Sequence, residues 1–283
     1  MRIATFNLLS GRAMGSEDAD PEQLRRAVRT LDADVLALQE VDRHQERSGG
    51  VDQTALVAEA VGARAWRFVP ALVGTPGGTW RAAGPADEEC DGVGSHEPAA
   101  YGIALVSRLP VISWKVVRLR PVPVVTPLRL GHPGERKRLV WVRDEPRTAV
   151  VAVVEGPDGP VTVANTHLSF VPRWNVAQLR RLVGALEDEP RPQVLVGDLN
   201  MPAGLPRWLC REWRQLVSER TWPAHTPRVQ LDHVLGRGGV PDGATGYAVE
   251  LELSDHRALV VDVPDGVGAG ADHGVRLTGH AGG

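Results

Sequence analysis

Acidic, amide and imidazole side chains recur in this sequence beside short apolar runs. Their carboxylate and amide oxygens suit a hard divalent cation such as Mg²⁺, Mn²⁺ or Ca²⁺. The imidazoles can transfer protons near neutral pH. Combined at one place, such groups support attack of water on a phosphoester with the help of a bound metal ion. The residues concerned are Asn7, Glu40, His167, Asp198, Asn200, Asp232, Asp255 and His256.

Each of these residues taken singly has a simpler interpretation. An Asn after a strand, such as Asn7, most often forms a turn. The segment Gly197-Asp198-Leu199-Asn200 is also typical of a turn, and His167 could be a core histidine bonded to the backbone. These interpretations do not explain together why such groups mark six strand ends in order. A common site at one end of a sheet is therefore the better hypothesis.

Apolar and alternating patterns predict the strands that must position these residues. Strand patterns cover residues 2–8, 34–39, 102–106, 148–154, 161–166, 194–196, 231–235, 245–250 and 256–263. Asp20 followed by Pro21 predicts a helix start, and Gly62 predicts the end of a helix over residues 53–61. Helical spacing of apolar residues predicts two more helices, at residues 176–186 and 208–217, with Trp208 and Trp213 in the core.

The order of these elements predicts a single α/β domain. Gly156-Pro157-Asp158-Gly159 predicts a hairpin, and hairpins imply antiparallel pairing, so a mixed sheet is expected rather than a purely parallel, doubly wound one. Two mixed sheets packed face to face, with helices outside, would accommodate all the elements. The domain is expected over residues 1–264. The Gly- and Ala-rich residues 265–283 are expected to form a disordered tail.

The composition limits the class of protein. With 42% hydrophobic and 24% charged residues, the 283-residue chain is typical of globular rather than disordered or fibrous proteins. A net charge of −3 argues against binding nucleic acid by bulk positive charge. Two cysteines, Cys90 and Cys210, are too few for a disulfide scaffold or a zinc site, and we expect free thiols. No apolar run could span a membrane and no secretory signal is visible, so we expect a cytoplasmic protein.

Two loop stretches differ sharply in charge. Residues 86–97 hold five acids and no Lys or Arg, whereas residues 118–147 hold eight basic residues and three acids. Either the basic stretch borders the site and attracts an anionic substrate, or both stretches are solvated loops that face each other. Residues 74–99 and 121–134 are predicted to be irregular. No exposed hydrophobic hairpin is evident in the sequence, which argues against a lipid substrate.

Seven short motifs, in this order, resemble the endonuclease/exonuclease/phosphatase superfamily of metal-dependent phosphohydrolases, which includes proteins similar to deoxyribonuclease I. The resemblance covers residues 3 to 263 and implies a four-layer α/β/β/α sandwich with the site at one edge. The motifs are Thr5-Phe6-Asn7, Leu38-Gln39-Glu40-Val41, Tyr101-Gly102-Ile103-Ala104-Leu105-Val106-Ser107-Arg108, Asn165-Thr166-His167-Leu168, Gly197-Asp198-Leu199-Asn200, Leu231-Asp232-His233-Val234-Leu235 and Ser254-Asp255-His256.

The resemblance also implies roles for the site residues. Glu40 would be the principal metal ligand, with Asn7 and Asp255 nearby. Asp198 and Asn200 would orient the attacking water, contact the phosphate or bind a second metal.

On the same basis, His256, held by Asp232, would be a base or a charged phosphate contact. His167 would stabilise the pentavalent phosphorus or protonate the leaving group. Similar proteins often place an arginine where Arg147 begins a strand, so we hypothesise that Arg147 binds a phosphate oxygen; the alternative is a surface arginine. Trp222 could stack on a base or sugar, or be a half-buried packing residue.

These expectations combine into a divalent-metal-dependent phosphoester hydrolase that uses Mg²⁺ or Mn²⁺, with Ca²⁺ as a third candidate. A phosphodiester is favoured over a phosphomonoester. The alternatives are a nuclease acting on DNA or RNA and a non-catalytic scaffold of the same fold. The expected partner is a phosphoester, either a small molecule or a nucleic acid. No membrane span and no obligate protein partner are expected.

Overall fold

The computed structural model describes residues 1–88, 98–123, 125–130 and 138–265. The predicted tail lies outside the described residues except for Asp265, and so do Cys90 and most of the acidic stretch 86–97. Among the described residues, no helix is long and apolar enough to cross a membrane.

Two sheets, both with parallel and antiparallel neighbours, form the centre of the molecule. The first has seven strands in the order β14 (Thr245–Val249), β15 (Ala258–Asp262), β1 (Arg2–Asn7), β2 (Val35–Arg43), β5 (Ala100–Ser107), β3 (Ala65–Gly74) and β4 (Trp80–Ala82). The second has six in the order β12 (Arg214–Gln215), β13 (Asp232–Arg237), β11 (Gln193–Asp198), β10 (Gly159–His167), β9 (Arg147–Gly156) and β6 (Val111–Leu119).

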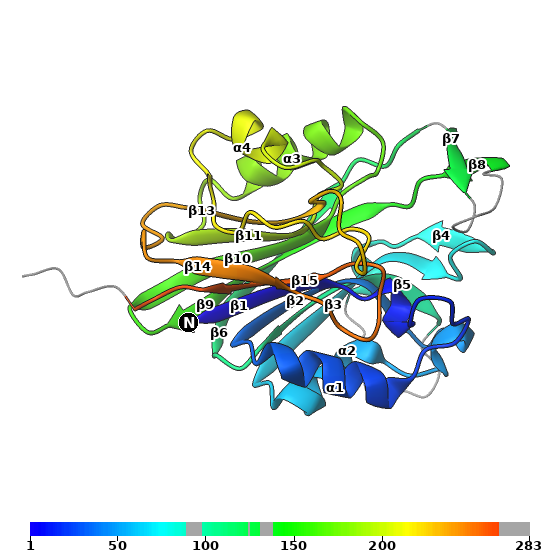
Figure 1. Ribbon diagram of the computed structural model, residues 1–283, viewed down its shortest axis with the longest axis horizontal. Coiled ribbons are helices and arrows are strands. Elements are labelled where there is room, and N and C mark those ends of the chain that lie inside the picture. Colours follow the sequence, from blue (N-terminus) through cyan, green and yellow to red (C-terminus); the bar gives the residue numbers. More distant parts are fainter. Residues whose placement is uncertain (89–97, 124, 131–137, 266–283) are drawn as a thin grey trace, which may run out of the picture.

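The sheets pack face to face with helices on both outer sides, which confirms the predicted α/β/β/α sandwich (Figure 1). Three apolar clusters fill the three spaces between the four layers. The first sheet is covered by α1 (Pro21–Leu31) and α2 (Gln53–Val61), and the second by α3 (Trp174–Ala185) and α4 (Leu205–Leu209).

The central strands are apolar along their length because both of their faces are buried. In β1, Ile3 packs between the two sheets, whereas Ala4 and Phe6 pack under the helices. The alternation follows from the period of two in a strand. Helix ends are set locally: the Asp20 carboxylate accepts a hydrogen bond from the Glu22 amide at 2.9 Å, and Gly62 ends α2 with a positive φ.

Parallel pairing brings the functional strand ends to one end of the sandwich. β1 runs parallel to β2, and β10 runs parallel to β11. Their carboxyl ends therefore lie side by side in each sheet. Asn7, His167 and Asp198 are the last residues of β1, β10 and β11, and Glu40 lies near the end of β2.

Gly197, directly before Asp198, is expected to tolerate no side chain. Its φ of +133° is a conformation that other residues rarely adopt, and a Cβ there would collide with the carbonyl oxygen of Thr166 on β10. We expect Gly197→Ala to lower the free energy of unfolding by about 3 kcal/mol or more. Urea titration followed by circular dichroism measures the change. Gly184→Ala is the control, because a Cβ at Gly184 in α3 meets nothing within 4 Å; equal midpoints for the two variants would contradict the prediction.

Some predicted elements were wrong or missing. The helix predicted over residues 208–217 ends at Leu209, because Arg214 and Gln215 pair with β13 as a short strand instead. Trp213 is buried as expected, but Trp208 is 64% exposed rather than in the core. Strands β3, β4 and β6 were not predicted, and β4 lies inside a stretch expected to be irregular.

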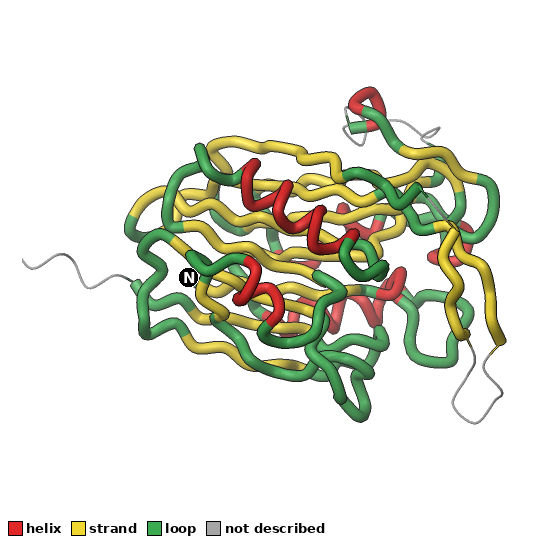
Figure 2. The backbone as a smooth tube through the Cα atoms, turned by 90° about the horizontal axis from the view of Figure 1, so that it is seen from above, coloured by secondary structure: helices red, strands yellow, loops and turns green. Residues whose placement is uncertain are grey.

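A separate hairpin extends beyond the sandwich at the end where β1 and β2 finish (Figures 1 and 2). It consists of β7 (Val125–Leu130) and β8 (Arg138–Arg143), which pair with each other as a two-stranded sheet. Trp141 is 66% exposed and Leu139 is 59% exposed. These strands correct two expectations: residues 121–134 are not wholly irregular, and the protein does carry an exposed hydrophobic hairpin.

Candidate active site

The polar residues at the strand ends converge on one cleft of about 610 Å³. Asn7 and Asp232 contact the cleft residues through hydrogen bonds. The other predicted site residues line the cleft itself; they are Glu40, Arg147, His167, Asp198, Asn200, Asp255 and His256.

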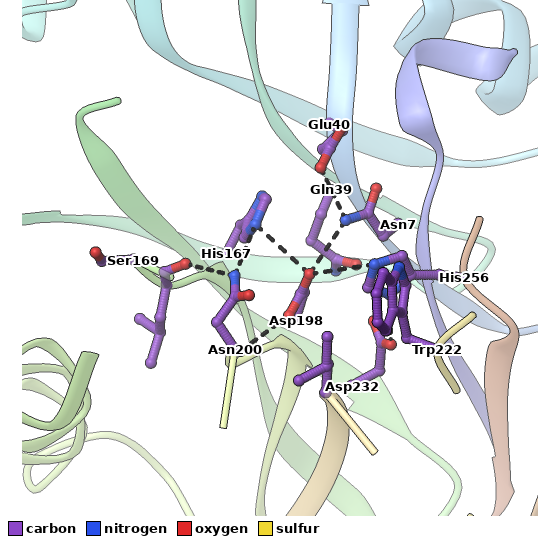
Figure 3. A network of polar contacts seen from close by, with 12 residues as sticks. Asn7, Gln39, Glu40, His167, Ser169, Asp198, Asn200, Trp222, Asp232 and His256 are labelled. Carbon is purple, nitrogen blue, oxygen red and sulfur yellow. Dashed lines mark hydrogen bonds and ion pairs between the residues drawn. The ribbon is translucent and has the colours of Figure 1, made fainter. Parts of the chain in front are cut away.

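Asp198 lies at the centre of the polar network (Figure 3). Its Oδ2 atom is 3.2 Å from Asn7 Nδ2, 3.5 Å from His167 Nε2 and 3.9 Å from His256 Nε2. Its Oδ1 atom accepts a hydrogen bond of 2.9 Å from the Asn200 amide. Burial, together with the negative charge of Asp232, raises the pKa of Asp198 to about 7. Asn7 and Asn200 therefore hold the Asp198 carboxylate in place, and its buried surroundings increase its affinity for a proton.

Asp232 and His256 form a buried pair. His256 Nδ1 lies 2.8 Å from Asp232 Oδ2, and Asp232 is fully buried. Burial opposes the charged imidazole, but the negative charge of Asp232 and this hydrogen bond outweigh it and raise the pKa of His256 to about 10. The second ring nitrogen, Nε2, remains directed toward Asp198. The pairing therefore fixes the orientation of the imidazole and favours its positive charge.

His167 has the opposite electrostatic environment. Burial, followed by the positive charges of Arg147 and His256, lowers the pKa of His167 well below its usual value. Its Nε2 atom lies 3.3 Å from the Asn200 side-chain nitrogen, which also donates to the Leu168 carbonyl. The lowered pKa favours a neutral imidazole, and its Nε2 atom lies between the Asn200 side chain and the Asp198 carboxylate, 3.5 Å away.

Three residues of the site region have left-handed backbones. Glu40 has a φ of +55°, Asn200 a φ of +49°, and Ser254, before Asp255, a φ of +72°. Such conformations cost about 1–3 kcal/mol each outside glycine and concentrate at functional sites. At Glu40 the register between β2 and β5 shifts between Leu38 and Val41, and the Glu40 carboxylate accepts a 3.1 Å hydrogen bond from Asn7. The irregular backbone thus supports side chains that line the cleft.

Two buried amides beneath the cleft join the sheets, and sequence reasoning assigned them no role. Gln39 donates to the Asn165 side chain at 2.7 Å and to the Thr5 hydroxyl at 2.9 Å. Asn165 in turn donates to the backbone carbonyls of Leu38 and Ala104. The sequence signal for both was a polar residue inside an otherwise apolar strand. A buried polar side chain requires a hydrogen-bond partner.

Arg147 is a buried arginine at the cleft, which excludes the alternative of a surface arginine. It is 7% exposed and donates to Asp144 at 2.8 Å, while Glu145 lies 3.9 Å away. Asp144 and Glu145 also line the cleft and were missed by sequence reasoning. The sequence signal for them was the acidic pair Asp144-Glu145, which comes shortly before Arg147 at the start of a strand.

Asp255 is held by the indole of Trp222. Trp222 Nε1 donates to Asp255 Oδ2 at 3.0 Å, and the 39% exposed side chain of Trp222 borders the cleft. This contact gives Trp222 a structural role beside the predicted stacking, which stays a prediction.

Both hypotheses about the charged stretches hold in part. Arg118 forms an ion pair with Glu88, as expected for stretches that face each other. Arg143 and Arg147 line the cleft, as expected for a basic border. The Arg143 guanidinium lies over the ring of Trp80, 5.1 Å from its centroid.

Two donor sets at the cleft could hold a divalent cation. Atoms of Asp198, Asp232 and His256 lie within 4.8 Å of one another. A cation on this set would displace the 2.8 Å hydrogen bond between Asp232 and His256. The cleft carboxylates of Glu40, Asp198 and Asp255 would supply oxygen donors only and would leave that pair intact, and Asn7 contacts two of them. Among the described residues, however, only the first set brings three ligand atoms within 4.8 Å of one another, so the second set stays a prediction from the family resemblance.

Solved structures with the same fold support the sandwich assignment. An endonuclease/exonuclease/phosphatase from Beutenbergia cavernae is 22% identical with a TM-score of 0.61, covering 92% of this chain and 70% of that one. The mannosyl-6-phosphatase of Bacteroides thetaiotaomicron is 14% identical with a TM-score of 0.58, covering 94% and 100%. Sphingomyelinase C from Streptomyces griseocarneus is 15% identical with a TM-score of 0.59, covering 93% and 99%. Identities this low establish the fold alone.

Sequence comparison establishes the family. No curated protein matches this sequence. A family model, however, matches residues 4–256, which spans every strand end of the cleft. The chain therefore belongs to the Endonuclease/Exonuclease/phosphatase family, whose members hydrolyse phosphoric esters.

Proposed function

We propose that this protein is a divalent-metal-dependent hydrolase that directs water at a phosphodiester. The observation that carries the proposal is the convergence of Glu40, Asp198 and His256 on one cleft from strands of both sheets and the loop before β15. Family membership supports a phosphoester substrate, as do structural neighbours named as a phosphatase and a sphingomyelinase.

Glu40, Asp198 and Asp255, with Asn7, would hold the cation, for which Mg²⁺ and Mn²⁺ are the candidates and Ca²⁺ the third. When bound, the cation supplies charge stabilisation for the phosphate oxygens.

The protein groups have separate tasks in this proposal. Asp198 is positioned by Asn7 and Asn200, so that one carboxylate oxygen would contact the cation and the other would accept a proton from the attacking water. His256 is held by Asp232 through Nδ1, so its Nε2 is free to donate to a phosphate oxygen. His167 and Asn200, in contact with each other, border the leaving-group side.

The preference for a phosphodiester over a phosphomonoester stays a prediction from the sequence. The cleft is lined by five carboxylates and by four arginines (Arg12, Arg47, Arg143 and Arg147), so its charge does not decide between the two substrates. We expect faster Mn²⁺-dependent hydrolysis of bis-p-nitrophenyl phosphate than of p-nitrophenyl phosphate, measured from initial rates of nitrophenolate release.

A plasmid-cleavage assay, run beside the ester assay, separates the two alternative functions, a nuclease and a non-catalytic scaffold. Cleavage of plasmid DNA in Mg²⁺ or Mn²⁺ that is lost in His256→Ala would favour the nuclease. Failure to hydrolyse either ester or DNA with any of the three metals would favour the non-catalytic scaffold and contradict the proposal.

A conservative substitution of Arg147 tests the predicted contact between its guanidinium and a phosphate oxygen. Because Asp144 occupies only part of the guanidinium, Arg147→Lys is expected to keep the ion pair but lose the planar fork. We expect KM for bis-p-nitrophenyl phosphate to rise about tenfold, corresponding to one charge-assisted hydrogen bond. The matched control is Arg118→Lys, whose arginine pairs with Glu88 and does not line the cleft. An unchanged KM in Arg147→Lys would remove the phosphate contact from the account.

A further inference from the structure

The β7–β8 hairpin presents an uncovered apolar face. Residues directly opposite in an antiparallel pair share a face, and Val125 lies opposite Arg143 while Pro127 lies opposite Trp141. Leu139 is two residues before Trp141 and shares the same side. These residues (Val125, Pro127, Leu139, Trp141 and Arg143) are all exposed, and we call them the hairpin face.

The exposure of this face is large for apolar side chains. Val125 is 52% exposed, Leu139 59% and Trp141 66%. Scattered single apolar residues on a surface are ordinary, but a contiguous group on one face of a projecting element marks an interaction surface. Neither β7 nor β8 pairs with any other strand in the part of the chain that the structure describes, so the sandwich does not account for the pattern.

The charge of the same segment indicates what covers the face. The described hairpin residues, 125–130 and 138–143, contain three basic residues (Arg129, Arg138 and Arg143) and no acid, although the whole chain has a net charge of −3. A second copy of this chain would bring two basic segments together, which electrostatic repulsion disfavours. An anionic partner is complementary to it instead. Tryptophan and aliphatic side chains next to arginines, as in the described part of this hairpin, are a combination that binds at the interface of a lipid bilayer.

We propose that the hairpin face binds the surface of a membrane that contains anionic lipids. Trp141, Leu139 and Val125 insert at the level of the headgroups, and the basic residues are attracted to the negative surface. Arg143 belongs to the hairpin face and also lines the active-site cleft, so binding places the cleft beside the membrane. The inference stands on the hairpin and does not depend on the proposed hydrolysis.

Sedimentation with lipid vesicles tests the proposal directly. The probes are vesicles of phosphatidylcholine alone and vesicles that also contain phosphatidylglycerol. We expect the protein to sediment with the anionic vesicles, and we expect added salt to weaken the binding. The double variant Leu139→Ser/Trp141→Ser is expected to bind about tenfold more weakly.

Trp208→Ser is the matched control, because Trp208 is 64% exposed but lies on α4, on the outer side of the second sheet. Circular dichroism checks that the variants are folded. Failure of the unmodified protein to bind anionic vesicles would overturn the proposal, as would equal binding by the double variant. Concentration-dependent dimerisation that is lost in the double variant would instead assign the face to a second copy. Because sedimentation needs no turnover, an inactive enzyme would leave this test unaffected.

Discussion

Replacing His256 with alanine is expected to lower kcat for bis-p-nitrophenyl phosphate about a thousandfold, within the range for loss of a positioned acid–base group. The buried carboxylate of Asp232 fixes the His256 imidazole at 2.8 Å, while the other ring nitrogen faces Asp198. Removal of the His256 imidazole would take away the proposed hydrogen bond to the phosphate, and it leaves Asp232 buried without a partner for Oδ2. Initial rates at saturating Mn²⁺ measure the loss.

Two further variants make the His256 result specific. Asp232→Asn keeps the size of the side chain but removes the charge that orients the imidazole, so we expect a loss of about a hundredfold. His225→Ala is the control, because the exposed His225 pairs with Glu250 and does not line the cleft. Loss of a general acid or base typically lowers the rate by at least about a hundredfold. If His256→Ala retains a tenth or more of the activity, His256 is therefore not part of the chemistry.

Replacing Glu40 with glutamine is expected to weaken Mn²⁺ binding at least about a hundredfold, because the proposed oxygen ligand would lose its charge without a change of shape. Glu40 reaches the cleft from a left-handed residue in an irregular part of β2, and Asn7 donates to it. Isothermal titration of metal-free protein with Mn²⁺ measures the dissociation constant independently of turnover. Glu59→Gln on α2, which removes an exposed carboxylate paired with Arg25, is the control.

The Glu40 experiment also decides between the two donor sets. If the metal sits on Glu40, Asp198 and Asp255, Asp232→Asn should weaken Mn²⁺ binding less than Glu40→Gln does, because Asp232 is then not a ligand. If Glu40→Gln binds normally and Asp232→Asn does not, the cation occupies Asp198, Asp232 and His256 instead.

The part of the site that the sequence predicted follows from short-range patterns. Strand periodicity located the ends of β1, β10 and β11, where Asn7, His167 and Asp198 are the last residues. The capping signals at Asp20 and Gly62 located one end each of α1 and α2. That the six strand ends converge was inferred from their occurring together in order, and the family resemblance supported it. Periodicity alone does not specify which strands are neighbours.

The features that sequence reasoning missed depend on contacts between distant segments. The pKa of His167 is lowered by burial and by Arg147, and that of Asp198 is raised by burial and by Asp232. Neither environment is visible in local sequence.

The sequence also did not show which apolar residues are exposed to solvent. Trp208 and Trp213 fit one helical face, yet one is exposed and the other buried, because the helix ends at Leu209. Strands β7 and β8 have an apolar pattern that ordinarily indicates a buried strand. In the structure they form a hairpin that projects from the sandwich. Patterns identify a strand but do not show whether another layer covers it.

The most direct test of the account is the metal dependence of phosphodiester hydrolysis. Protein stripped with a chelator is expected to show no turnover of bis-p-nitrophenyl phosphate, and added Mn²⁺ or Mg²⁺ should restore the rate in the unmodified protein but not in Asp198→Asn. Undiminished turnover in excess chelator, or equal restoration in Asp198→Asn, would contradict a metal-assisted reaction centred on this cleft.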